Sequence, residues 1–250
     1  MMMGENLTDP TVDERLAILL GSASVDTVDD VIALMREIDA LLPDDDGLKW
    51  FNLLYLKVTE AVKDNPTAGG WEDPRWLERL DVLFARLYFD AVAGWQRDRE
   101  ESARAWRPLL DCRRRGGVAR IQFALAGMNA HINHDLAIAV VQTGEEQTIT
   151  PRRGSPQHRD FERVNALLEI VEEEAKQFLV TGIIGEIDHN LGRLDDLVAL
   201  WKIGKARDTA WTNAEILWQL HPSPTLKKKF LLNLGRLVGL SSKGLLVPTG

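Results

Sequence analysis

A short stretch near the middle of the chain, AGMNAHINHDLAIAV, gathers side chains that can do chemistry. His131 and Asp135 are four residues apart, so on an α-helix they lie one turn apart on the same side. Asn129 and Asn133 have the same spacing and are expected on the other flank of the apolar face. His134 is predicted to point further toward solvent. Asn and Asp are unfavourable inside helices, and such departures from local preference are expected at functional sites.

Two kinds of chemistry suit a His–Asp pair at this spacing. His131 and Asp135 can supply two ligands to one divalent metal ion, although a complete site needs a further ligand from another helix. His131 can instead act as an acid or base while Asp135 orients its ring. Asn129 is a candidate catalytic group beside them, and Asn133 can hold a substrate carbonyl or hydroxyl. A purely structural cluster that satisfies neighbouring backbone groups stays open.

Helical periodicity accounts for most of the chain, and no segment shows the sustained alternation of a strand. Apolar residues repeat every three or four positions, and prolines fall between the periodic runs. The predicted helices cover about 28–42, 48–62, 74–94, 100–112, 118–142, 159–181 and 193–220, with one more after Ser223. We therefore expect an all-α fold, a single globular domain of about eight or nine helices with no sheet.

The predicted organisation has three parts. Residues 1–25 are expected to form a flexible N-terminal segment, and residues 26–220 to form the helical domain. Residues 221–250 are expected to form a basic C-terminal helix and tail that packs on this domain.

Charge is distributed unevenly along the chain, which carries a formal net charge of −8. Five basic residues and no acidic residue follow Glu215. We expect the last helix to pack on the acidic body of the protein through an ordinary apolar stripe. That stripe consists of Phe230, Leu231, Leu234, Leu237 and Val238. The less favoured alternative is peripheral contact with an anionic membrane or an acidic partner.

Composition excludes several classes of protein. A hydrophobic content of 45% is too high for a disordered chain, and one cysteine cannot build a disulfide scaffold or a cysteine-rich zinc module. The acidic balance argues against nucleic-acid binding. The longest apolar runs are far shorter than the roughly 20 residues of a transmembrane helix, and no secretory signal is evident. A cytoplasmic protein is the expectation.

The stretch GMNAHINHDL at 127–136 resembles the signature of an uncharacterised bacterial family, a domain of unknown function. The resemblance implies a helical fold and little about chemistry. The family pattern allows Arg where this chain has His134, which favours Asn129, His131 and Asp135 as site residues. The resemblance covers most of the chain from about 40 to 220 and leaves out the first 25 residues and the tail past about 225. Its other pieces are DGLKWFNLLYLKVT, DPRWLERLDVLFARLYFDA, RDFERVNALL and ARDTAWTNAEILW.

Those pieces contain further candidates for substrate binding. Tyr55 and Tyr88 come from two of them, and Asp81 lies seven residues before Tyr88 on the same helix face. Arg207 and Trp211 are four apart and can stack as cation on ring. Aromatic residues such as Tyr55, Tyr88 and Trp211 are more often part of a core than of a site.

A second motif, Glu186-Ile-Asp-His189, has the spacing used by di-iron helical bundles. Such a centre needs a second copy of the motif and two further carboxylates, and no second copy exists here. Di-iron chemistry is therefore not favoured.

Two classes of function remain open. The first is an enzyme of hydrolase, lyase or cyclase type that acts on a small, largely apolar molecule by acid–base or metal-assisted chemistry. The second is a non-catalytic helical ligand-binding or scaffold protein, in which the Asn/His/Asp cluster is a structural hydrogen-bond node. A cavity lined by His131 and Asp135 would favour the first class.

Overall fold

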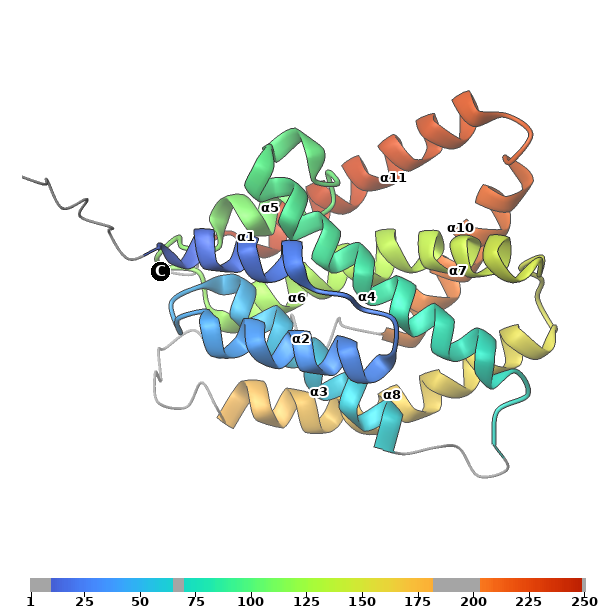
Figure 1. The fold of residues 1–250 in the computed structure, drawn as a ribbon, viewed down its shortest axis with the longest axis horizontal. Coiled ribbons are helices and arrows are strands. Elements are labelled where there is room, and N and C mark those ends of the chain that lie inside the picture. Colours follow the sequence, from blue (N-terminus) through green and yellow to red (C-terminus); the bar gives the residue numbers. More distant parts are fainter. Residues whose placement is uncertain (1–9, 65–69, 182–202, 249–250) are drawn as a thin grey trace, which may run out of the picture.

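The computed structural model describes residues 10–64, 70–181 and 203–248, and this part of the chain is helical without any strand (Figure 1). The helices are α1 (Val12–Ser22), α2 (Val28–Leu41), α3 (Gly47–Asp64), α4 (Pro74–Arg97), α5 (Arg107–Cys112), α6 (Arg120–Ala130), α7 (Leu136–Gln147), α8 (Pro156–Thr181), α10 (Ile203–Gln219) and α11 (Pro224–Leu245). A short 3₁₀ turn, η1 (Arg99–Glu101), precedes α5, and a π-helical turn, η2 (His131–Asp135), joins α6 to α7. Counted with this continuous helix as one, the described residues form nine helices, which confirms the all-α expectation.

The continuous helix α6–η2–α7 runs through the middle of the domain. Helices α3 and α11 pack against α6, while α4 and α10 pack against α7. Every residue from Ile121 to Met128 is buried. A helix enclosed on all sides must be apolar around its whole circumference, which explains the run of Ala, Leu, Ile and Phe there.

Helices α3 and α6 approach closely because each carries a glycine at their contact. A Cβ atom on Gly127 would lie 2.4 Å from the ring of Phe51, and one on Gly47 would lie 2.4 Å from the ring of Phe123. Each phenyl ring therefore occupies the space that a side chain would need. This contact fixes how deeply α3, which carries Tyr55, sits against the central helix.

Residues 12–22 form α1, in contrast to the flexible segment expected for residues 1–25. A capping box begins this helix: the Thr11 amide donates to Glu14 at 2.7 Å, and the Glu14 amide donates to the Thr11 hydroxyl at 3.2 Å. Leu16 is wholly buried. The reciprocal cap and this apolar anchor stabilise the helix.

Two helix boundaries differ from the predicted ones. The segment expected at 100–112 is helical only from Arg107, because a 3₁₀ turn and loop precede it. The helix expected to end near 142 continues past Gly144 to Gln147 and ends at Thr148, which has a left-handed backbone (φ 58°). Gly144 instead allows close approach of the Ile149 carbonyl.

Helix α11 lies along one edge of the bundle (Figure 1) and buries a narrow strip of small and apolar residues against α6. This strip contains Gly235, Val238 and Ser242. Leu237 was expected in the buried stripe, but 66% of its surface is exposed. The reason is that two glycines draw the helix in along one line, so Leu237 points away from the body.

Two expectations remain: the motif and helix predicted between 186 and 220, and the absence of a transmembrane helix. Glu186, His189 and the first residues of the helix expected at 193–220 lie outside the described residues. Within the described ranges, no helix combines the length and apolarity needed to cross a bilayer.

We expect Gly127→Ala to lower the free energy of unfolding by about 1–3 kcal/mol, because the added methyl group overpacks the contact with Phe51. Urea denaturation measures this change. Gly21→Ala in α1 is the matched control, since no atom lies within 4 Å of its Cβ position. Equal stability of the two variants would contradict the close packing of α3 on α6.

Candidate functional site

The carboxylate of Asp135 is buried at the centre of the site and accepts three hydrogen bonds. Trp106 Nε1 donates to Oδ2 at 2.7 Å, and His131 Nδ1 lies 3.1 Å from the same oxygen. His134 Nδ1 lies 2.7 Å from Oδ1. An ionised carboxylate can only accept, so both imidazoles carry a proton on Nδ1. This leaves the Nε2 atom of a neutral imidazole with a lone pair.

The π-helical turn brings both histidines to this carboxylate. The Leu136 amide donates to the carbonyl of His131, five residues back, so the turn is wider than an α-helical one. The extra residue rotates the rest of the helix by about 100° relative to a regular one. His134, predicted to point toward solvent, is therefore buried, and its ring lies near Gly235 of α11.

The pKa values at this cluster are shifted in consistent directions. Burial alone would raise the pKa of the Asp135 carboxyl, but hydrogen bonds from His131 and His134 together hold that pKa below its usual value. Burial lowers the pKa of His131, and the hydrogen bond and charge of Asp135 offset only part of this effect. His131 is therefore neutral near pH 7 and available as a proton acceptor.

The Nε2 atom of His131 is buried and has no hydrogen-bond partner within the protein. The ring stacks on Phe84 with 3.6 Å between centroids and meets the edge of Tyr55 at 4.5 Å. Its side chain exposes no surface, so contact between Nε2 and a ligand requires a shift of these neighbouring rings. A buried polar atom without a hydrogen-bond partner destabilises the folded protein. Contact with a ligand after the rings shift would explain why Nε2 has no partner within the protein.

A cavity of about 420 Å³ borders this ring cluster, and Tyr55, Phe84 and His131 are among its lining residues. It lies between α3, α4, α8, α10 and the central helix, near the start of α2. Most of its lining is apolar, including Val58, Leu77, Phe84, Met128, Ile132 and Val164. Its polar lining residues are His131, Tyr55, Thr59, Asp81 and Arg207, together with Thr27, Asp29, Lys63 and Glu78.

Asp81 and Arg207 give this cavity unusual electrostatics. Burial raises the pKa of Asp81 to about 7, against the opposing effect of the Arg207 charge. Burial lowers the pKa of Arg207 to about 10, again opposed by the charge of Asp81. Arg207 is held in place because its Nε donates to Asn165 at 2.6 Å and its guanidinium lies 4.2 Å from the ring of Phe161.

Only two of the predicted substrate-binding aromatic and cationic residues reach the cavity, namely Tyr55 and Arg207. Tyr88 is fully buried elsewhere, and its hydroxyl donates to Asn52 at 3.2 Å. Trp211 is also fully buried and packs against Trp76. The predicted stacking of Arg207 on Trp211 is wrong, because Arg207 stacks on the ring of Phe161 instead.

Asn129 holds α11, Asn133 bonds to Asn129, and neither is among the residues that line the cavity. Asn129 Nδ2 donates to the Val238 carbonyl at 3.1 Å and to the Ser242 hydroxyl at 2.9 Å. Asn133 Nδ2 donates to Asn129 Oδ1 at 3.0 Å. The expected roles of Asn129 in catalysis and Asn133 in substrate binding do not fit this geometry, because the Asn129 amide is engaged with α11 and the Asn133 amide with Asn129 on the same continuous helix.

His131 and Asp135 do not fit the metal-ligand pair that their spacing suggested. Both oxygens of Asp135 already accept hydrogen bonds, and His131 turns its Nδ1 toward that carboxylate. Across the described parts of the chain, no three His, Cys, Asp or Glu side chains are grouped so that they could hold a metal ion.

Trp106 was not among the predicted site residues, and Asp81 was predicted only as a group near the site. Trp106 supplies an N–H group to Asp135 from 29 residues away, and no local pattern announces that pairing. The sequence predicts that Asp81 shares a helix face with Tyr88, but not that it lines the cavity. An acid between apolar residues in the sequence RLDVLF of α4 is the signal that could have marked it.

We expect His131→Gln to reduce the loss of stability in acid. The lowered pKa means that the unfolded chain binds a proton at His131 more readily, so His131 contributes stability that is present above pH 6.5 and lost as pH falls through its folded-state pKa. Between pH 7.5 and 5.5, the wild type should lose about 1 kcal/mol more than the variant, as measured by urea denaturation.

The control for this experiment is Ile18→Gln, because it places the same new side chain at a position that is 66% exposed and removes no titratable group. This variant should keep the pH dependence of the wild type. The same pH dependence in both variants would show that His131 is not held neutral by burial.

Comparison with known proteins adds a family but no activity. No curated protein and no solved structure matches the chain. A model described as a family of unknown function, DUF5995, matches residues 28–248. This match extends beyond the 40–220 expected from the sequence pieces and includes α11. The chain therefore belongs to DUF5995, a family of unknown function.

Proposed function

We propose that this protein is an enzyme that binds a small, largely apolar molecule in the cavity and acts on it by acid–base chemistry. The observation that carries the proposal is the convergence of Asp81, Arg207 and His131, each with a shifted pKa, on the wall of one apolar cavity. Ionisable groups are rarely kept in such a place unless they serve a function.

Asp81 is the proposed proton-transfer group nearest to a bound molecule. With a pKa of about 7, its carboxyl is present in both protonated and ionised forms at neutral pH. A group of this kind can donate a proton to a substrate and accept one from it with little energetic penalty. It needs no metal ion to do so.

Arg207 is the proposed anchor for an acidic or carbonyl group of the substrate. Its guanidinium is buried in the cavity wall, and Asn165 and the ring of Phe161 fix its orientation. A positive charge in apolar surroundings attracts an anion more strongly than one in water does. The substrate class implied by these groups is an apolar body with one acidic or strongly polar group.

His131 is the proposed second base, and Asp135 is its positioning residue. The hydrogen bond to Asp135 fixes the Nδ1–H tautomer and leaves Nε2 as the acceptor. Binding must displace the rings of Tyr55 and Phe84 before Nε2 meets a substrate. Two bases on one apolar cavity suit the proton transfers of hydrolase, lyase or cyclase reactions. We propose that the protein acts in the cytoplasm.

A second candidate is a non-catalytic ligand-binding protein. The observation that favours it is the complete burial of His131 in a ring cluster, with Asp135 fully satisfied by donors. In this case Asp135 organises the core, and the cavity only stores or senses its ligand.

Incubation of the purified protein with an extract of cellular small molecules separates the two candidates. Mass spectrometry should show at least one compound that the wild type consumes and that Asp81→Asn consumes at least about 100-fold more slowly, the usual scale of a general acid–base contribution. Asp90→Asn, also on α4 but outside the cavity lining, should keep the wild-type rate.

If no compound is consumed while a ligand still binds in the cavity, the protein is a binder and the catalytic proposal fails. If Asp81→Asn consumes the same compound at the wild-type rate, Asp81 has no part in proton transfer.

Binding of 2-naphthoate, an apolar ring system with one carboxylate, tests the charge arrangement. As pH falls through about 7, Asp81 takes up a proton and stops repelling the bound anion. We therefore expect the affinity to be about fivefold higher at pH 6 than at pH 8, because the loss of one nearby negative charge has a modest Coulomb effect on a bound anion. Isothermal titration calorimetry measures both values.

Asp81→Asn should bind 2-naphthoate equally well at both pH values, whereas Asp90→Asn should keep the pH dependence of the wild type. Arg207→Gln should weaken binding at both. An affinity that does not change with pH in the wild type would contradict the proposed state of Asp81.

A further inference from the structure

The outward face of α11 carries large apolar side chains that nothing in the described structure covers. Leu226, Leu237 and Leu240 are 51%, 66% and 54% exposed. At about 100° per residue, these three leucines fall within about 60° of each other on the helix. Leu237 and Leu240 are three residues apart and adjacent in space, whereas Leu226 lies about three turns earlier on the same face, with exposed Asn233 between them. Exposed leucines that share one face of a helix mark a contact surface more often than scattered single ones do.

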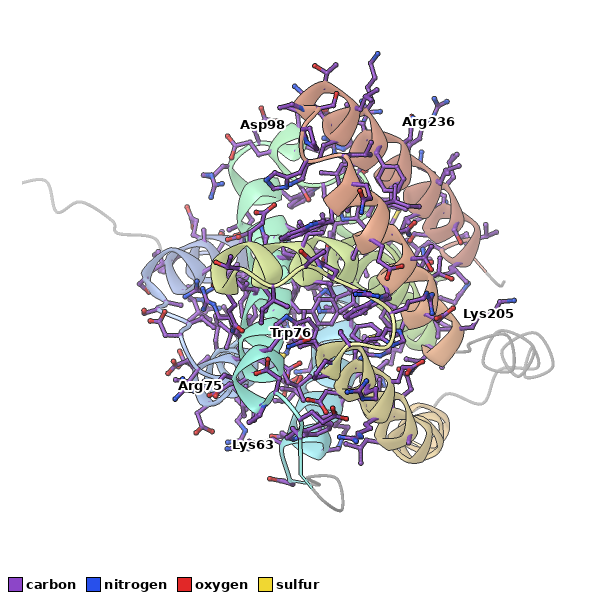
Figure 2. The ribbon with its side chains drawn as sticks, turned by 90° about the vertical axis from the view of Figure 1, so that its right-hand side faces the viewer. Lys63, Arg75, Trp76, Asp98, Lys205 and Arg236 are labelled. Atoms are coloured by element: carbon purple, nitrogen blue, oxygen red, sulfur yellow. The ribbon has the colours of Figure 1, made fainter. Side chains whose placement is uncertain are left out.

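Basic side chains flank this leucine stripe. Lys229, Arg236 and Lys243 lie along one side of it, and α11 contains no acidic residue. Figure 2 shows Arg236 on the outer side of the molecule. Among the described residues, only Lys227 of this basic set forms an ion pair, with Glu145 at 3.0 Å.

The inner face of α11 is fixed to the domain, so the stripe cannot rotate inward. A Cβ atom on Gly239 would lie 2.5 Å from the Arg104 carbonyl, which leaves no space between helix and body. Asn129 donates to Ser242, and Gln122 Nε2 donates to the carbonyls of Leu245 and Val247 at 2.7 and 2.8 Å. The leucines are thus displayed by a rigid, hydrogen-bonded support.

A groove of about 450 Å³ opens between α11, the residues around Arg104 and α7. Leu231, Leu232 and Ile138 give it an apolar wall, and Lys228 lies at its edge. This groove lies on the side of α11 that faces the body, so it is separate from the leucine stripe.

We propose that α11 docks on the surface of an anionic phospholipid membrane. The leucine stripe would enter the boundary between head groups and acyl chains, while the flanking Lys and Arg side chains meet lipid phosphates. A symmetric pairing of two α11 helices would instead place the same basic residues against each other, which like-charge repulsion disfavours. The proposal is independent of the chemistry assigned to the cavity.

Sedimentation of the full chain with lipid vesicles tests this docking. Vesicles of equal parts phosphatidylcholine and phosphatidylglycerol should bind the protein at least about tenfold more tightly than vesicles of phosphatidylcholine alone. Raising the salt concentration from about 0.1 M to about 0.5 M should weaken that binding, because charges at the surface are screened.

Two pairs of variants assign the binding to this face. Leu237→Ser should weaken binding to the anionic vesicles by about tenfold, whereas Ile18→Ser, at a side chain with the same 66% exposure on α1, should leave it unchanged. Arg236→Gln should weaken binding by about fivefold, whereas Arg97→Gln, on exposed α4 surface, should not. Circular dichroism confirms that each variant is folded.

The proposal is overturned if the protein binds neither kind of vesicle, binds both equally, or binds anionic vesicles as well after Leu237→Ser. It is also overturned if sedimentation equilibrium shows a dimer that Leu237→Ser dissociates, because the stripe then contacts a second copy of the chain.

Discussion

The buried carboxylate of Asp135 imposes the requirement on which the centre of this domain depends. A charge in the core must be surrounded by donors, and this one receives N–H groups from Trp106, His131 and His134. Two of these donors, His131 and His134, come from the same continuous helix as the acid. The Nδ1–H tautomers of His131 and His134 and the position of Trp106 before α5 meet this need, whereas the neutral state of His131 follows from its burial.

The positions of the helices were predictable because they depend on local periodicity, as in α2, α3 and α4, but some helix ends were not, such as the start of α5. The neighbourhood of His131 and Asp135 was predictable from their spacing. Side-chain directions after His131 were not, because a wheel of 3.6 residues per turn does not register an inserted residue. The pairing of Trp106 with Asp135 and the approach of Asp81 to Arg207 depend on how distant helices pack, which single-sequence periodicity does not contain.

The central helix serves different neighbours on its two sides. One side presents His131 to the ring cluster that borders the cavity, with Asp81 and Arg207 beyond it. The other side presents Asn129, which holds α11 through Val238 and Ser242. The Asn129 amide, predicted as part of a reaction site, thus holds a surface helix in place, and Asn133 bonds to Asn129. This division explains why one short stretch is so rich in polar residues.

The wide turn at 131–135 also means that the central helix contains one residue more than its hydrogen-bond ladder would need. Deleting that surplus residue would restore an unbroken α-helix and would improve its local regularity. It would also rotate α7 by about 100° against α4 and α10, turning Val140 and Ala139 away from the core. The number of residues in this segment therefore matters as much as their identity, because it sets the rotation of α7 about the helix axis.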